Sequence, residues 1–359
     1  MSFDISKLNN FQASLEMISN IGLIERFTGE WVRSDRLSPE LIKSLKKTTI
    51  VTSSGASTRI ENALMTDENV ADFINQGCKI TKLSSRSERE VAGYIKVLEY
   101  IYEGGHQEII SEHFIRTLHQ LMTKTFSKDM LPDSQRGSYK NVPNDVVEKN
   151  QATGEEKIWF ETTPPGSQTA AAMAELIKKY HEYINTILPK PIVIGWFIVH
   201  FLAIHPFRDG NGRLSRLLTI YLMMKNGYSW MPFVSHEKFI EDNKERYYVS
   251  LRETQKSFRG SKINYEPWLE FFVRVLQKQV RYLEEKVFQE QIEPKRIFGK
   301  NEKYVMQLLK DSKSLSRNEL QSMASMSEKG MKLLLNRLID RGEVERIGVG
   351  KSSRYRIKI

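Results

Sequence analysis

The chain has 359 residues, of which 40% are hydrophobic and 27% charged, and its net charge is +10 at pH 7. This length allows two or three domains, and this composition is typical of a soluble globular protein. The longest apolar run, Ile192 to Ile204, is shorter than the roughly 20 residues that a membrane span needs. A single cysteine, Cys78, excludes an internal disulfide and a cysteine-built zinc site. The amino terminus lacks a basic segment followed by an apolar core, so we expect no signal peptide and a cytoplasmic location.

The positive charge is concentrated at the carboxy-terminal end. From Arg296 onward there are 15 Lys/Arg and 7 Asp/Glu, which accounts for +8 of the total of +10. The basic character therefore belongs to a carboxy-terminal module and says little about the larger part of the chain.

The amino-terminal region, residues 1–110, is predicted to be helical. Phe27 and Trp31 are four residues apart and would share one helix face. The small and hydroxylated residues from Val51 onward predict a loop that leads into a helix over about residues 55–66. Ser57 and Glu61 would then lie on the same face of that helix.

Apolar residues recur every three or four positions through the middle of the chain, which predicts amphipathic helices. The expected helices are 87–102, 111–125, 169–188, 192–204, 214–226, 237–256 and 265–289. Prolines and glycines interrupt this pattern between residues 131 and 165. Extended segments at Tyr139–Val142 and Lys157–Thr162, with a tip at Thr153–Gly154, predict a hairpin-like flap there.

A proline-containing stretch, residues 290–296, predicts a linker to a second domain. Three short helical patterns follow at 302–309, 317–323 and 327–340, and then two extended segments at 344–347 and 353–359. This order predicts a winged helix-turn-helix domain over residues 297–359. The fold class is therefore mainly α, with a small flap and a carboxy-terminal winged helix.

The densest group of functional residues is His205 to Arg216, which reads H-P-F-R-D-G-N-G-R-L-S-R. The segment Gly210-Asn211-Gly212 runs into the amino terminus of a predicted helix, where free N–H groups and the helix dipole favour anions. Arg213 and Arg216 lie on one face of the first turn and can grip phosphate oxygens.

Two further groups complete this site. Asp209 is a hard oxygen ligand, suited to a Mg²⁺ that bridges phosphates. His205 is the one group of this segment that titrates near neutrality, so it can accept a proton from an incoming hydroxyl. An Asn-Gly turn alone is weak evidence of function, but the combination with a histidine, a carboxylate and two arginines indicates phosphate chemistry.

At these residues the chain resembles the Fic family, because His205 to Arg216 matches the signature H-x-F-x-(D/E)-G-N-G-R-x-x-R at every defined position. The resemblance implies a helical catalytic core over residues 111–290. It also implies transfer of AMP from MgATP to a Ser, Thr or Tyr hydroxyl of a protein, with release of pyrophosphate. In that mechanism His205 is the general base and Asp209 holds Mg²⁺. The phosphate nest is Gly210, Asn211 and Gly212, and Arg213 and Arg216 grip the outer phosphates.

The resemblance extends to a regulatory motif. Ser57-x-x-x-Glu61-Asn62 is similar to the family's inhibitory motif, (S/T)-x-x-x-E-(G/N), whose glutamate pairs with the second arginine of the signature. This implies that Glu61 pairs with Arg216 and occupies the γ-phosphate position.

Two more segments resemble family elements that border the nucleotide. Trp159-Phe160-Glu161-Thr162 is similar to the flap, which aligns the target segment by strand pairing. Glu245-Arg-Tyr-Tyr248 resembles the helix on the adenine side, and Tyr247 is the candidate for packing on the base. Gln255 stands where some members have an asparagine.

The carboxy-terminal module adds basic residues that suit DNA. Lys329, Lys332 and Arg337 would lie on the second helix of the helix-turn-helix, while Arg346 and Arg354 would lie on the wing.

Three functions stay open: a self-inhibited adenylyltransferase that modifies other proteins and itself, a bifunctional enzyme that also removes AMP, and a DNA-binding regulator with a nucleotide-sensing core. The resemblance also leaves a homodimer open, and no membrane partner is expected.

Overall fold

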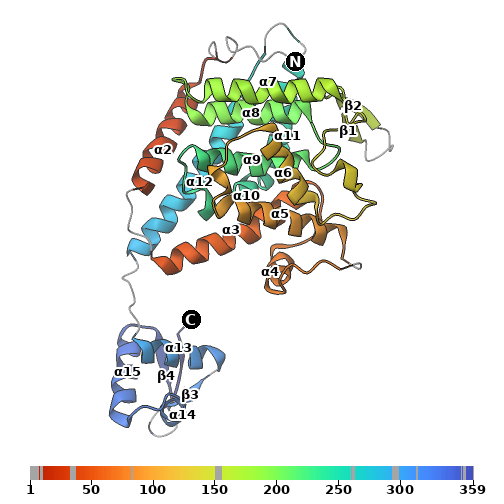
Figure 1. The fold of residues 1–359 in the computed structure, drawn as a ribbon. Coiled ribbons are helices and arrows are strands. Elements are labelled where there is room, and N and C mark those ends of the chain that lie inside the picture. Colours follow the sequence, from red (N-terminus) through yellow and green to blue (C-terminus); the bar gives the residue numbers. More distant parts are fainter. Residues whose placement is uncertain are drawn as a thin grey trace. The chain divides into compact units, whose positions relative to one another are not determined.

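The computed structural model describes Leu8 and residues 11–32, 38–81, 84–149, 156–258, 260, 263–292, 299–312, 314–348, 350 and 353–358. The chain divides into two compact units, residues 1–288 and 289–359. Helices dominate both units (Figure 1), which confirms the mainly α fold class. No helix in these described ranges is both long enough and apolar enough to cross a membrane.

The larger unit is a helical domain with one small β-hairpin. Its helices are α2 (Leu15–Val32), α3 (Pro39–Ile60), α4 (Asp67–Asn75), α5 (Arg86–Tyr102), α6 (Glu112–Thr123), α7 (Ser167–Tyr183), α8 (Lys190–Ile204), α9 (Asn211–Lys225), α10 (His236–Glu241), α11 (Lys244–Ser257) and α12 (Glu266–Ile292). The hairpin is formed by β1 (Val146–Lys149) and β2 (Glu156–Phe160). Short 3₁₀ turns lie at Gly105–Gln107, Asp133–Gln135 and Met231–Phe233.

Helix α8 forms the centre of this unit. Every residue from Pro191 to Ile204 is buried, because the helix is apolar on all sides and is covered by its neighbours. It packs against α7 and α9, and Figure 1 shows α7 and α8 side by side. The sequence predicted this buried helix at 192–204. The residue that ends it, His205, is thereby fixed at the edge of the core.

Helix α3 differs from the prediction. The segment from Val51 to Ser54 is helical rather than a loop, because α3 begins at Pro39 behind the N-cap Ser38. The helix ends at Ile60, before the expected end at about residue 66. Its hydroxyl groups donate to carbonyls one turn earlier instead of breaking the helix, at Thr52, Ser54 and Thr58. The small side chains let α3 pack closely against α5 and α10. Glu61 therefore follows the largely buried end of a long helix.

Two other segments also depart from the sequence-based expectation. The first flap strand is Val146–Lys149 rather than Tyr139–Val142, and it pairs antiparallel with β2 in a register that places Val146 opposite Phe160. The predicted tip, Thr153–Gly154, lies outside the described residues. The helix expected over 237–256 is divided into α10 and α11 at Asp242–Asn243.

The smaller unit has its own core. It contains α13 (Lys300–Asp311), β3 (Leu315–Ser316), α14 (Arg317–Met323), α15 (Glu328–Asp340), β4 (Val344–Ile347) and β5 (Arg354–Ile357). The strands form an antiparallel sheet in the order β3-β5-β4. The buried residues include Leu320, Leu334, Leu338 and Val344. Most of the expected linker, residues 293–296, lies outside the described residues.

Candidate active site

The candidate site begins where α8 ends. His205 adopts a left-handed conformation, with φ of 53°, which ends the helix and turns the chain into the following loop. Its Nδ1 lies 3.2 Å from the carbonyl oxygen of Leu202. A carbonyl can only accept, so Nδ1 carries the proton and Nε2 is left with a lone pair. Burial lowers the pKa of His205, an effect to which nearby Lys140 contributes, so the imidazole is neutral near pH 7.

The loop after His205 is held by internal hydrogen bonds. The Asn211 side chain accepts from the Phe207 amide at 2.9 Å and donates to the Phe207 carbonyl at 2.6 Å. The ring of His119 stacks on Phe207, with centroids 3.9 Å apart. His119 Nδ1 accepts from the Gly137 amide, so its Nε2–H donates to the Asp209 carbonyl at 3.0 Å. The Asn211 amide thus shapes the loop, and only backbone groups of this residue are left to meet a phosphate.

Helix α9 starts immediately after Gly210, whose φ of 84° suits glycine. The first N–H groups of a helix have no partner within it, and together with the helix dipole they form an anion site. A Cβ built on Gly212 would collide with Glu61 Oε1. The carboxylate of Glu61 therefore lies directly over the first turn of α9, where an anion would bind.

Arg216 is the residue that Glu61 contacts. Its guanidinium is buried and donates from Nη2 to Glu61 Oε1 at 3.0 Å and to the Ser57 carbonyl at 2.8 Å. Its Nε donates to Ser57 Oγ at 2.9 Å. The structure thus brings together the three residues that the sequence singled out in the two motifs, although α3 and α9 are more than 150 residues apart.

Arg213 lies deeper in the protein than expected for a residue that grips outer phosphates. Its side chain is 3% exposed, and it contacts Glu90 Oε1 at 3.0 Å and Asp209 Oδ1 at 3.0 Å. Glu90, on α5, is itself 5% exposed and also accepts from Arg86 Nε at 2.9 Å. Glu90 therefore fixes the position of Arg213, a role that no sequence motif indicated.

Asp209 is more accessible than Arg213. Its side chain is 31% exposed; Oδ1 accepts from Arg213, and Oδ2 lies 3.6 Å from Arg86 Nη2. No group of three or more His, Cys, Asp or Glu that could form a metal cage occurs among the described residues. A single carboxylate fits Mg²⁺, which is commonly bound by one or two carboxylates together with substrate phosphates.

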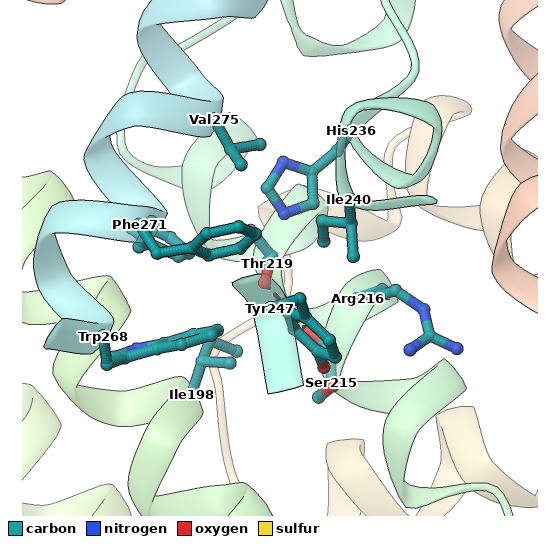
Figure 2. Close-up of a pocket in the computed structure, with 11 residues that line it drawn as sticks. Ile198, Ser215, Arg216, Thr219, His236, Ile240, Tyr247, Trp268, Phe271 and Val275 are labelled. Atoms are coloured by element: carbon teal, nitrogen blue, oxygen red, sulfur yellow. Dashed lines mark hydrogen bonds between the residues drawn. The ribbon is translucent and has the colours of Figure 1, made fainter. Parts of the chain in front are cut away.

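Tyr247 lies in the core rather than facing an open site. Its ring is 3% exposed and packs near Trp268 and Phe271. Figure 2 shows it beside a small pocket, between Trp268 and Arg216, with the Arg216 guanidinium directed away from that pocket. This packing buries the ring of Tyr247, whereas the neighbouring Tyr248 is half-buried. The Tyr248 hydroxyl donates to the Ile60 carbonyl, at the end of α3 next to Glu61.

The flap residues have different environments. Trp159 is half-buried, and the Arg252 guanidinium of α11 lies 5.3 Å from its ring centroid. Phe160 is buried, whereas Glu161 is exposed. The contact between Trp159 and Arg252 joins the flap to α11, the helix that carries Tyr248.

Five residues that contact this region were not singled out from the sequence: Glu90, Lys140, Tyr248, Arg252 and Asn144, whose Nδ2 donates to the His205 carbonyl. Tyr248 could have been found, since its neighbour Tyr247 was chosen from the same pair. The others lie far along the chain from the signature, and their types and spacing carry no pattern that points to it.

Fold and site together describe a helical protein in which a neutral histidine precedes a loop that leads into the amino terminus of α9. Residues 109–223 match the model of the Fic/DOC family. The chain therefore contains a Fic/DOC domain over these residues. It is 32% identical over 87 residues to a Fido domain-containing protein of Dictyostelium discoideum, and 27% identical over 161 residues to a probable protein adenylyltransferase of Aquifex aeolicus. The matched segments cover 23% and 44% of this chain, and 61% and 44% of those relatives.

Solved structures share the fold. A Fic family protein from Desulfovibrio desulfuricans G20 superimposes with a TM-score of 0.70 over 97% of both chains, at 20% identity. Fic-1 from C. elegans gives a TM-score of 0.57 at 17% identity, covering 76% of this chain and 73% of that one.

Proposed function

We propose that this chain is a protein adenylyltransferase, which transfers AMP from MgATP to a hydroxyl group of a protein and is restrained by Glu61. The observation that carries the proposal is the neutral His205, with an unprotonated Nε2, next to the anion site at the start of α9. The similarity to a probable protein adenylyltransferase supports the same type of reaction.

The proposed reaction is a displacement at the α-phosphorus of ATP. The target hydroxyl gives its proton to His205 Nε2 while its oxygen forms a bond to the α-phosphorus. The bond from the α-phosphorus to the bridging oxygen breaks, and the electron pair leaves with pyrophosphate. Backbone N–H groups at Gly210 to Gly212 would hold the phosphates, and no protein covalent intermediate is required.

Charged groups around the loop would complete the substrate site. Asp209 would hold Mg²⁺, which neutralises phosphate charge when bound. Arg216 would bind the outermost phosphate once Glu61 leaves it, while Arg213, fixed by Glu90, would contribute positive charge from below the loop.

Glu61 is the proposed restraint. Its carboxylate lies over Gly212 and pairs with Arg216, so it competes with a phosphate for both partners. Most of the end of α3 is buried, whereas the Glu61 side chain is 36% exposed. Release of inhibition therefore requires only that this side chain turn away, with α3 remaining in place.

The test is incubation with ATP labelled at the α-phosphate, using the parent chain and its Glu61→Gly and His205→Ala variants. The proposal expects more protein-bound label with Glu61→Gly and none with His205→Ala. Label on the Glu61→Gly/His205→Ala double variant at the Glu61→Gly level would contradict the catalytic assignment. Removal of AMP from a modified protein by the parent chain would instead support the bifunctional alternative.

A second proposal concerns the smaller unit, in which we infer a winged helix from the order of helices and strands. Lys329 and Lys332 are exposed on α15, the helix that would enter a DNA groove. However, wing residues Arg354 and Arg356 pair with Glu319 and Glu345 of the same unit, which reduces the free positive charge. Salt-dependent binding of duplex DNA that is lost in Lys329→Glu/Lys332→Glu would support the proposal, and no binding at low salt would exclude it.

A further inference from the structure

Four consecutive carbonyl groups at the start of the signature all accept hydrogen bonds from the same short segment. The carbonyl of Ile204 accepts from Lys140 Nζ at 3.1 Å, and that of Pro206 accepts from the Lys140 amide at 2.8 Å. The carbonyls of His205 and Phe207 accept from Asn144 Nδ2 at 3.0 and 2.7 Å. Two residues thus fix the backbone on both sides of His205.

Lys140 acts here as a buried ammonium group. The residue is 1% exposed, and Nζ donates to Asn144 Oδ1 and Thr162 Oγ1, both at 2.6 Å, as well as to Ile204. Three acceptors around one nitrogen require three N–H groups, which only the protonated form provides. Burial lowers the pKa of Lys140 to about 8, so the ammonium form still prevails at neutral pH.

The same contacts reach the flap. Thr162 follows β2, and its backbone N–H donates to Asp145 Oδ1 at 2.8 Å, while its hydroxyl lies 3.0 Å from Asn144 Oδ1. Lys140 and Asn144 therefore join the entry and exit of the flap to the loop that carries His205.

His205 needs such support because its backbone lies in the left-handed region, where a non-glycine residue is strained. We propose that Lys140 and Asn144 form a clamp of positioning residues that holds the His205 backbone in its reactive conformation and couples it to the flap. This inference rests on the proposed function, in which His205 is the base.

The clamp also affects the charge around His205. The charged groups that face the imidazole are Lys140, Glu61 and Asp209. Lys140 is the cation among them, so it disfavours protonation of His205, whereas the two carboxylates favour it. Removal of the ammonium group would raise the pKa of His205, and the base would then be neutral only at higher pH.

The first test does not depend on activity. Amide hydrogen exchange is measured on the full chain and on Lys140→Met and Asn144→Ala, with Lys128→Met as the control because that lysine side chain is 84% exposed. The clamp predicts faster exchange confined to residues 204–212 and the flap in the two test variants. Unchanged exchange there, or an equal increase throughout the domain, overturns the proposal.

The second test uses the Glu61→Gly background. Lys140→Met should lower kcat about 100-fold, the effect of a small misplacement of a reacting group, with the Kd for ATP nearly unchanged. The acidic limb of the pH profile should move to higher pH, which a purely structural role would not cause. An unchanged kcat and pH profile contradicts the clamp. If the Glu61→Gly parent itself transfers no AMP, the proposed function fails, and hydrogen exchange still decides whether the clamp exists.

Discussion

Replacing Glu61 by Gln tests how much the negative charge of this side chain contributes to inhibition, because the side chain keeps its shape and loses only its charge. The ion pair with Arg216 is a charge-assisted hydrogen bond at 3.0 Å, worth about 1.5–3 kcal/mol net, against about 0.5–1.5 kcal/mol for a neutral bond. Because Glu61 is 36% exposed and solvent screens the pair, we take the lower end of the difference, about 1 kcal/mol. ATP would then compete with a contact that is weaker by about 1 kcal/mol, so the Kd for ATP should fall about fivefold.

The assay is calorimetric titration with MgATP of chains that all carry His205→Ala, which prevents turnover. Glu68→Gln is the matched control, since Glu68 is an exposed acid on α4. The gain in affinity should shrink as salt is added, because screening weakens the competing pair. Equal or weaker ATP binding by Glu61→Gln, with the control unchanged, would refute the competition between this carboxylate and the phosphates.

Two further predictions concern stability. His200 is buried, and burial lowers its folded-state pKa to about 3, so the unfolded chain binds an extra proton below its ordinary pKa of about 6.5. The stability contributed by neutral His200 is fully present above pH 6.5 and is lost as the pH falls toward 3. Between pH 7 and 5, the free energy of unfolding in urea should fall by about 2 kcal/mol less for His200→Gln than for the parent. Equal losses would contradict this. Glu90→Gln should lower the free energy of unfolding in urea at pH 7 by about 3 kcal/mol, because it removes a buried charged partner of Arg213. An unchanged midpoint would show that Asp209 alone is sufficient to compensate the charge of Arg213.

The sequence predicted best what is local along the chain. The signature from His205 to Arg216 places its groups within one loop and one helix turn, so their proximity follows from the covalent chain. Helix α8 was equally clear because its apolar residues are continuous. By contrast, α3 was misassigned where hydroxylated residues normally favour turns, since its packing against α5 and α10 outweighs that local preference.

Contacts between distant segments could not be predicted in the same way. Tyr247 and Tyr248 are separated by a rotation of about 100° along α11. Only the packing against Trp268 and Phe271 shows that the ring of Tyr247 is the buried one. The clamp residue Lys140 has the sequence context of an ordinary loop lysine. Its burial beside His205 depends on contacts with Asn144, Thr162 and Ile204, which no local pattern encodes.

The most direct test of the proposed chemistry is to compare ATP labelled at the α-phosphate with ATP labelled at the γ-phosphate, using the Glu61→Gly chain. Transfer of AMP predicts that the α label becomes bound to protein, whereas the γ label leaves as pyrophosphate. Addition of His205→Ala to this chain should abolish the bound label. Protein-bound γ label, or no bound label from either position, would contradict the proposal that this site is an adenylyltransferase.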